Sequence, residues 1–391
     1  MFADAIPKIT TALTLAGLAY YLLALWSARS FDRARRKRLP DFHPAVSILK
    51  PVKGLDPEMY ESFASHCRQQ YAGEYEIIFG VSRLDDPAVV AIERLKAEFP
   101  ERTIRLVECP DVLGTNGKVS NLVQILPHAR YGHVLINDSD IKVSPNYLTR
   151  VLASFENPYH AGGRVGLVTA PYRGKTHRTL GSKMEALGIA TDFVAGVLAA
   201  RKIESGIHFA LGSTLAVSRE ALDAIGGLLP LVDYLADDFE LGARVARAGF
   251  EVILSGEVVE TFVPAYSFRQ FLVHQIRWSR STRDSRKLGY AGLLFTFGVP
   301  WALLNVIASG VTLPSLALLS LILLARVALA LAVGVGIVND RQVIRDLWLL
   351  LPRDVIALCI WIWSYAGNEV AWRGEIFALK NGKLHRTVAS S

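Results

Sequence analysis

An uncharged stretch near the start of the chain limits what this protein can be more than any other feature. Residues Ile9–Ser27 (ITTALTLAGLAYYLLALWS) carry no charge and are long enough to cross a bilayer as a helix. A cleaved signal peptide fits less well. The apolar run is too long, only Lys8 precedes it as a basic residue, and no small-x-small site stands before the basic cluster that follows. Residues 1–28 are therefore predicted to be a retained membrane anchor.

A basic cluster follows the anchor at once and indicates its orientation. Basic residues collect on the cytoplasmic side of membrane proteins. Residues 29–44 are thus predicted to be a cytoplasmic linker in what we expect to be a bacterial inner-membrane protein. The net charge of +7 gives no reason to expect a nucleic-acid partner, since no aromatic-basic interleaving of the RNA-binding type is present. The cluster comprises Arg29, Arg33, Arg35, Arg36, Lys37 and Arg38.

Residues 45–265 have the composition of a soluble domain. Short apolar segments indicate buried strands, and the stretches between them have helical spacing. This alternation predicts an α/β domain with a mostly parallel central sheet, in which ligands bind beyond the carboxyl ends of the strands. The predicted strands are Val46–Leu49, Glu76–Val81, Ile104–Val107, His133–Ile136 and Val165–Ala170, and the predicted helices include Met59–Gln70, Pro87–Phe99 and Val119–Leu126.

The chain becomes apolar again after an amphipathic stretch at residues 266–290, which is expected to lie at the membrane interface. Residues 291–368 are predicted to form membrane helices, and residues 369–391 a tail. Four crossings would put this basic tail on the far side, against the positive-inside tendency. Either residues 347–354 lie in the interface, or one segment is re-entrant. The candidate segments are Ala291–Ala308, Ser315–Val338 with Arg326 near its middle, and Leu347–Gly367, interrupted by Pro352-Arg353-Asp354.

Two aspartates, Asp138 and Asp140, follow the predicted strand His133–Ile136. Alternate residues of an extended segment point to the same side, so the two carboxylates repel each other unless something cationic lies near them. They are suited to hold Mg²⁺ or Mn²⁺, which then binds a diphosphate. A capped turn is the alternative, because about one such spacing is expected by chance in a chain of this length.

Two loops after predicted strands are candidates for nucleotide binding. Lys50 and Pro51, in the stretch SILKPVKG, are suited to contact a base or a phosphate, or else they form a solvated turn. Asp85 and Asp86 follow another strand, where one of them is a candidate to hydrogen-bond a uracil or a ribose. Asp86 also fits the N-cap of a helix that begins at Pro87.

Two predicted helix starts carry further polar groups. Lys118 and Asn121 are three residues apart and hence on one face, where a lysine suits a phosphate and where both otherwise serve as a helix cap. Asp237 and Asp238 begin a helix that Gly249 ends. One of them is a candidate general base for an acceptor hydroxyl. The alternative is that these first-turn acids only stabilise the helix.

His274, Arg277 and Trp278 lie on an amphipathic helix just before the membrane segments, where Arg and Trp also serve as interfacial anchors. Taken in order, these motifs resemble the ceramide glucosyltransferases and the related hopanoid-associated lipid glycosyltransferases, in the inverting family-2/21-like group. The likeness runs from about Val46 to Trp278, with matching membrane segments on both sides. It implies a GT-A (Rossmann-like) fold with N- and C-terminal transmembrane helices.

The resemblance also implies roles for single residues. Asp86, with Asp85 beside it, matches the first essential aspartate, near the uridine. Lys118 matches a lysine beside the nucleotide. Asp138 matches the second aspartate, and with Asp140 it would hold the metal and diphosphate. Animal ceramide glucosyltransferases have glycine at the Asp140 position, so this pair is more similar to the wider superfamily.

Further along the chain, Asp238 matches the third aspartate, the base. Arg277 and Trp278 match the end of a Gln/Arg-x-x-Arg-Trp motif, and His274 replaces its first residue. Arg277 is expected to help as negative charge builds on the leaving UDP.

The expected activity is transfer of a hexose from a UDP-sugar to a lipid hydroxyl with inversion, with glucose and ceramide as the favoured pair. The nearest alternative is N-acetylglucosamine transfer to a hopanoid polyol. A processive polysaccharide synthase shares the motifs, but three or four spans are few for a polymer channel. A non-catalytic nucleotide-binding scaffold is disfavoured, because a scaffold needs no base.

Overall fold

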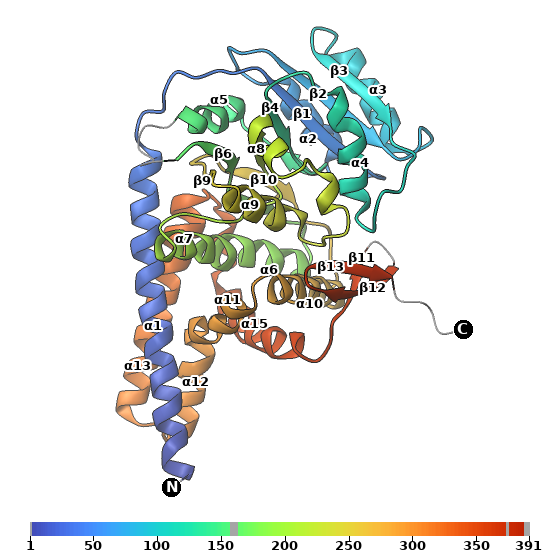
Figure 1. Ribbon diagram of the computed structural model, residues 1–391. Coiled ribbons are helices and arrows are strands. Elements are labelled where there is room, and N and C mark those ends of the chain that lie inside the picture. Colours follow the sequence, from blue (N-terminus) through green and yellow to red (C-terminus); the bar gives the residue numbers. More distant parts are fainter. Residues whose placement is uncertain (1, 157–162, 373–374, 387–391) are drawn as a thin grey trace, which may run out of the picture. The chain divides into compact units, whose positions relative to one another are not determined.

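The computed structural model describes residues 2–156, 163–372 and 375–386, and the chain forms two compact units (Figure 1). The helical unit comprises Met1–Arg33, Thr176–Glu204 and Ala265–Asn381. The sheet unit comprises Ala34–Lys175, Ser205–Pro264 and Gly382–Ser391. Each unit is described by itself below.

The sheet unit is built on a seven-stranded sheet with the order β3-β2-β1-β4-β8-β6-β9. Strands β3, β2, β1 and β4 run parallel to one another, and β6 runs parallel to β9. Only β8 runs against both of its neighbours, β4 and β6. The prediction of a mostly parallel central sheet is therefore confirmed.

The predicted strands agree closely with the observed ones, and the main difference is in β1. This strand continues through Pro51 to Val52, where Pro51 pairs with Gly80 of β2. The pairing of β1 with β4 already ends at Leu49 and Ile136. Pro51 thus lies where β1 has one neighbour only, a position at which a strand tolerates proline.

Helices α2, α3 and α4 pack beside the β1-β2-β3 part of the sheet (Figure 1). Phe63 of α2 meets Phe79 of β2 with ring centroids 4.7 Å apart, and both side chains are fully buried. Burial of a side chain of this size contributes about 1.5–3 kcal/mol. This core fixes the strands whose carboxyl ends carry the predicted site residues.

The elements of the sheet unit follow in chain order. They are β1 Val46–Val52, α2 Met59–Cys67, β2 Tyr75–Val81, α3 Ala88–Glu98, β3 Thr103–Glu108, α4 Gly117–Ile125, η1 Leu126–His128, β4 His133–Ile136, β5 Ile141–Lys142, α5 Tyr147–Leu152, η2 Ala153–Glu156, β6 Val165–Thr169, β7 Tyr172–Lys175, β8 Leu215–Ser218, α8 Arg219–Ala224, η4 Leu229–Leu231, α9 Asp237–Arg247, β9 Glu251–Leu254, β10 Val259–Phe262 and β13 Lys383–Arg386.

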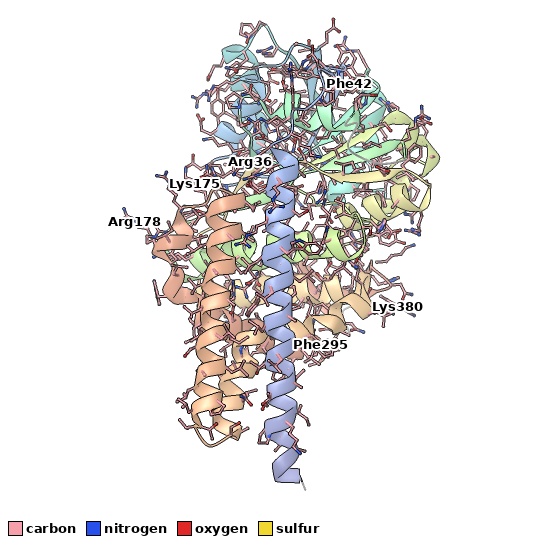
Figure 2. All side chains as sticks on the ribbon, turned by 90° about the vertical axis from the view of Figure 1, so that its left-hand side faces the viewer. Arg36, Phe42, Lys175, Arg178, Phe295 and Lys380 are labelled. Atoms are coloured by element: carbon pink, nitrogen blue, oxygen red, sulfur yellow. The ribbon has the colours of Figure 1, made fainter. Side chains whose placement is uncertain are left out.

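The helical unit contains, among the described residues, three helices long and apolar enough to cross a membrane: Ala5–Arg35, Leu313–Ile337 and Leu347–Ser364. Helices α1, α12 and α13 lie side by side (Figure 1, Figure 2). A Cβ on Gly17 of α1 would lie 2.3 Å from Gly298 Cα of α12, so only glycine allows this approach. Small residues at such contacts are typical of membrane helix pairs.

The structure adds detail to the C-terminal segments and corrects one prediction. Lys287–Thr296 and Gly298–Ala308 meet at an angle of 51°, the geometry of a broken span or of a re-entrant segment, which the sequence left open. Pro352 does not interrupt the last segment, contrary to the prediction, since it lies in the first turn of α15. The first N–H groups of a helix have no intrahelical partner, so proline is tolerated there.

Strands near the end of the chain were not predicted. In the helical unit, β11 pairs with β12 in antiparallel fashion. In the sheet unit, Leu384 N of β13 donates to Asp233 O at 2.8 Å, and Leu235 N donates to Gly382 O at 3.0 Å. The elements of the helical unit are α1 Phe2–Arg35, α6 Leu180–Gly188, the π-helix η3 Ile189–Phe193, α7 Val194–Ile203, α10 Phe268–Ser285, α11 Lys287–Gly292, η5 Leu293–Thr296, α12 Gly298–Ala308, α13 Leu313–Ala330, the π-helix η6 Leu331–Ile337, α14 Gln342–Arg345, η7 Leu347–Leu349, α15 Leu350–Ser364, β11 Glu369–Trp372 and β12 Glu375–Lys380.

Candidate active site

Asp138 lies at the carboxyl end of β4, and its neighbour Asn137 fixes its position. The Asn137 side chain is fully buried. Its amide donates to Tyr147 Oη at 2.9 Å and to Ser213 O at 2.7 Å, and its oxygen lies 3.2 Å from His66 Nε2. A buried amide with all these partners leaves the chain little freedom. Asp138, with a side chain 40% exposed, therefore faces outward from a rigid base.

Lys118, in the first turn of α4, joins two of the predicted carboxylates. Its Nζ lies 2.9 Å from Asp138 Oδ1 and 3.0 Å from Asp237 Oδ2. Burial opposes the charge of Lys118, but the carboxylates of Asp138, Asp237 and Asp238 together raise the pKa of this ammonium well above its ordinary value. The ammonium of Lys118 thus supplies part of the positive charge that was expected near the aspartates.

Asp238 adjoins this ion-pair cluster at the start of α9. Burial and the charge of Asp237 raise the pKa of Asp238 to about 6, and Lys118 partly offsets them. Gly212 also lies beside the cluster. A Cβ there would lie 3.0 Å from Asp238 Oδ2 and 3.7 Å from Asp138 Oδ2, so a larger residue would crowd the Asp238 carboxylate.

Asp140 lies deeper than Asp138 and accepts a hydrogen bond from the hydroxyl of Thr261. Burial and the charge of Asp138 raise the pKa of Asp140 to about 6. Lys50 is fully buried next to this turn, and its Nζ donates to Asp138 O at 3.2 Å. Burial lowers the pKa of Lys50 to about 7, against the opposing effect of Asp140 and Asp138.

The two candidate nucleotide loops meet through Asp86. Both of its carboxylate oxygens lie 3.0 Å from Gly54 N, which donates to them, and Oδ1 also accepts from Ala88 N at 2.9 Å. The helix begins at Ala88, one residue later than predicted. Asp85 points elsewhere. Its side chain is 68% exposed and pairs with Arg83, which lowers the pKa of the Asp85 carboxyl.

Asn121 does not share partners with Lys118, although both belong to α4. Its Oδ1 accepts from Ser82 Oγ at 3.1 Å, and its Nδ2 donates to Gly80 O at 3.4 Å. The Asn121 side chain is buried and links the helix to the carboxyl end of β2. Of these two residues, Lys118 is the one that extends from α4 to the aspartates.

The remaining predicted residues belong to α10 in the helical unit. His274 Nδ1 lies 3.0 Å from Glu185 Oε1 of α6, without hydrogen-bond geometry. The neighbouring Gln275 donates to Glu185 Oε2 at 2.8 Å. The His274 ring packs on Trp278 with centroids 4.9 Å apart. Arg277 is on the same helix, so the three motif positions share one element.

Metal ligation was predicted for Asp138 and Asp140. Within residues 2–156, 163–372 and 375–386, no three His, Cys, Asp or Glu side chains gather into a group that could hold a metal ion. The chain therefore offers two carboxylates. Mg²⁺ and Mn²⁺ are commonly held by one or two carboxylates together with substrate phosphates and water. The donor set fits a divalent cation that shares its coordination with a diphosphate.

Several residues that contact the site aspartates or support them were not predicted from the sequence. Asn116 caps α4 through Val119 N and donates to Asp237 Oδ1 at 3.4 Å. Asn137 has a signal in the sequence, since a polar residue between an apolar strand and Asp138 is unusual. Gly212 and Thr261 have none, because only the folded chain brings them to the aspartates.

Comparison with solved structures identifies the fold. The chain is similar to a mannosyltransferase from Pyrobaculum calidifontis, solved in complex with GDP-Man and Mn²⁺. The TM-score is 0.55 and the sequence identity 21%, with coverage of 92% of this chain and 98% of the other. The predicted GT-A fold is confirmed. Residues 9–385 match the model of Glycosyl transferase family 21, so the chain belongs to this family.

Curated relatives are similar over part of their length. The chain is 25% identical to Ceramide glucosyltransferase 3 of Caenorhabditis elegans over 69% of this chain and 59% of that protein. It is also 25% identical to Ceramide glucosyltransferase 1 of the same organism, over 58% of this chain and 47% of that protein. The chain thus spans about half the length of these relatives. The predicted resemblance to ceramide glucosyltransferases is confirmed, and the apolar helices identify a membrane protein.

Proposed function

We propose that the protein transfers a hexose from a UDP-sugar to the hydroxyl of a lipid, with glucose and ceramide as the favoured pair. The observation that carries this proposal is the cluster of Asp138, Asp237 and Asp238 around Lys118. Carboxylates in such a cluster are suited to hold a cation for the donor diphosphate and to supply a general base. The ceramide glucosyltransferase relatives support the choice of acceptor.

In this proposal, Asp138 and Asp140 hold Mg²⁺ or Mn²⁺, which when bound neutralises charge on the donor diphosphate. Lys118 stays beside the same phosphates and keeps Asp138 oriented. Asp86 orders the loop at Gly54 for the uridine, with Asp85 at its exposed edge. Lys50 supports the turn from inside, and Pro51 and Asn121 shape the ends of β1 and β2.

Asp238 acts as the general base in the proposal. A carboxylate whose pKa is raised to about 6 is still ionised at neutral pH, yet it accepts a proton more readily than an ordinary aspartate. It takes the proton from the lipid hydroxyl as the oxygen attacks the anomeric carbon, with inversion in one displacement. Asp237 remains the alternative base. Arg277 stabilises the charge on the leaving UDP, and Trp278 and His274 position Arg277 on α10.

The proposal extends to location and to the nearest alternative. The protein is placed as a multi-pass membrane protein with its sheet unit on the cytoplasmic side, on the strength of the basic residues that follow the anchor. Transfer of N-acetylglucosamine to a hopanoid polyol is the second candidate. It would use the same base, the same metal carboxylates and the same lysine.

The test compares two variants of the purified full-length protein. Asp238→Asn keeps the size of the side chain but cannot accept the proton, so lipid glycosylation should fall about 10²–10⁴-fold. UDP binding should stay within a few-fold of wild type. Asp138→Asn should instead weaken UDP binding in the presence of Mg²⁺. Asp223→Asn, on the exposed side of α8, is the matched control. Near-normal turnover by Asp238→Asn would remove it from the role of base.

A further inference from the structure

Four charged side chains form a buried cluster inside the helical unit, remote in sequence from the predicted motifs. Arg326 of α13 binds both oxygens of Asp354 of α15, at 2.8 Å from Nε and 2.9 Å from Nη2. Its Nη2 also donates to Asp192 Oδ1 of η3 at 2.5 Å. Arg353 of α15 lies 3.7 Å from Asp192 Oδ2.

Ion pairs that only hold helices together are expected to satisfy all their buried atoms. In this cluster two atoms stay unsatisfied among the parts of the chain that the structure describes. Asp192 Oδ2 and Arg326 Nη1 are buried and have no hydrogen-bond partner. One is an acceptor and the other a donor. Charges within membrane segments are costly and usually functional. The unpaired acceptor and donor therefore point to a ligand rather than to a role in helix packing alone.

Exposure indicates which member of the cluster lies nearest the surface of the unit. The side chain of Asp192 is 36% exposed, whereas those of Arg326, Asp354 and Arg353 are 3%, 8% and 8% exposed. Asp192 also lies on a π-helical segment between α6 and α7. Single π-helical turns within α-helices are frequent at functional sites, because they turn a side chain out of the regular helical row.

The charge balance indicates the chemistry of the ligand. Two arginines and two aspartates cancel, so an anionic lipid would leave an unbalanced charge in an apolar unit. A neutral group that both donates and accepts hydrogen bonds would satisfy Asp192 Oδ2 and Arg326 Nη1 together. Hydroxyl and secondary amide groups have this property.

We propose that Asp192 and Arg326 bind the hydroxyl and amide head of a neutral lipid of the class proposed as the acceptor. The proposal rests on the proposed function for the class of that lipid. A path of contacts also leads from the cluster to the predicted motif on α10. Arg353 Nη2 donates to Gln275 Oε1 at 3.3 Å, and Gln275 donates to Glu185, the partner of His274.

The experiment measures lipid binding without any sugar donor, so that it is independent of the test of Asp238. A diazirine-bearing ceramide is photo-crosslinked to the purified full-length protein, and the half-saturating concentration is determined. Asp192→Asn keeps an oxygen for Arg326 but loses the charge that attracts the hydroxyl proton. We expect it to raise the half-saturating concentration about tenfold or more, equivalent to ~1.4 kcal/mol. UDP binding should stay close to wild type, and the fall in Tm should be no larger than that of Asp354→Asn.

Asp354→Asn is the matched control. Asp354 binds Arg326 through both of its oxygens, so this substitution should lower Tm, and any effect on lipid binding should come with that loss of stability. Unlabelled ceramide and a hopanoid polyol are tested as competitors, and phosphatidylglycerol should compete poorly. Mass spectrometry should locate the crosslink on peptides from η3, α13 or α15. Crosslinks elsewhere, equal competition by phosphatidylglycerol, or unchanged binding by Asp192→Asn would each overturn the proposal.

Discussion

Lys118 determines how the candidate site behaves before any substrate arrives. Its ammonium lies between Asp138 and Asp237, at 2.9 Å and 3.0 Å, so two carboxylates from distant parts of the chain are held without a bound ion. Because Lys118 pairs with Asp138 Oδ1, the other oxygen of Asp138 is the one left for a further cation. The first prediction concerns that cation.

Removal of divalent metal should abolish transfer, and Mg²⁺ or Mn²⁺ should restore it, because two carboxylates and a lysine do not neutralise a diphosphate alone. Asp140→Asn should raise the Mg²⁺ concentration for half-maximal activity about tenfold, roughly the effect of one lost charged ligand. Activity is measured in EDTA and in EDTA saturated beforehand with Mg²⁺, which serves as the control. Full activity in the chelator, with the absence of metal verified, would contradict the assignment.

The pH dependence should report Asp238. Burial and Asp237 raise the pKa of this carboxyl to about 6, so its base form is complete above pH 7 and is lost as the pH falls. At saturating donor and metal, kcat should decrease about tenfold per pH unit below pH 6. The pKa of Asp140 is also raised to about 6, but a bound cation favours its ionised form and moves its titration to lower pH. A rate that stays flat from pH 7.5 to pH 5 would speak against Asp238 as the base.

At the scale of elements, α10 depends on α6 through Glu185. This buried carboxylate accepts from Gln275 and lies 3.0 Å from His274 Nδ1. His274→Gln should keep transfer within a few-fold, since relatives are expected to carry Gln or Arg there. In a double-mutant cycle with Glu185→Gln, the two substitutions should couple by about 0.5–3 kcal/mol in unfolding free energy. Thermal unfolding of the four proteins measures this coupling, and additive effects would show that the pair is incidental.

The elements themselves were largely predictable, because each has a local cause. The strand His133–Ile136 is an apolar run that a polar residue and a proline limit, and the structure has the same bounds. Helix α9 begins at Asp237, as first-turn acids and Gly249 indicate. Alternation of such segments was enough to predict the sheet, since parallel strands need helical connections.

The rest depended on contacts between distant residues. No local pattern shows that Lys50 points inward while Lys118 reaches two aspartates, because the partners of both lysines lie far away in the sequence. The π-helix η3 could not be predicted, because its amino-acid composition is similar to that of the flanking helices. The hydrogen bond of Leu384 to Asp233 joins residues that are far apart in the sequence.

At the scale of the whole molecule, the basic residues after the anchor predict that the sheet unit is cytoplasmic. Val90 on α3 is 75% exposed, so Val90→Cys provides a reporter in that unit. Cys359 is exposed and is first changed to serine, whereas Cys67 and Cys109 are buried and remain. In intact cells, the reporter should resist an impermeant maleimide and react only after permeabilisation.

The matched control for this experiment is Ile6→Cys at the other end of α1, where the side chain is 56% exposed. If α1 crosses the membrane as predicted, this cysteine should react in intact cells. Labelling of Val90→Cys without permeabilisation would reverse the orientation. Protection of both cysteines would mean that α1 does not cross.

The pairing of β13 with the loop before α9 sets an order for biosynthesis. Thr115, just before α4, donates to Asp233 Oδ1 from both its N, at 3.0 Å, and its hydroxyl, at 3.1 Å. Leu384 donates to the carbonyl of the same Asp233. Asp233 therefore holds the start of α4 through its side chain and β13 through its carbonyl. A nascent chain can insert its anchor and form its sheet early in translation, but the carbonyl of Asp233 gains this partner only after residue 384 has left the exit tunnel.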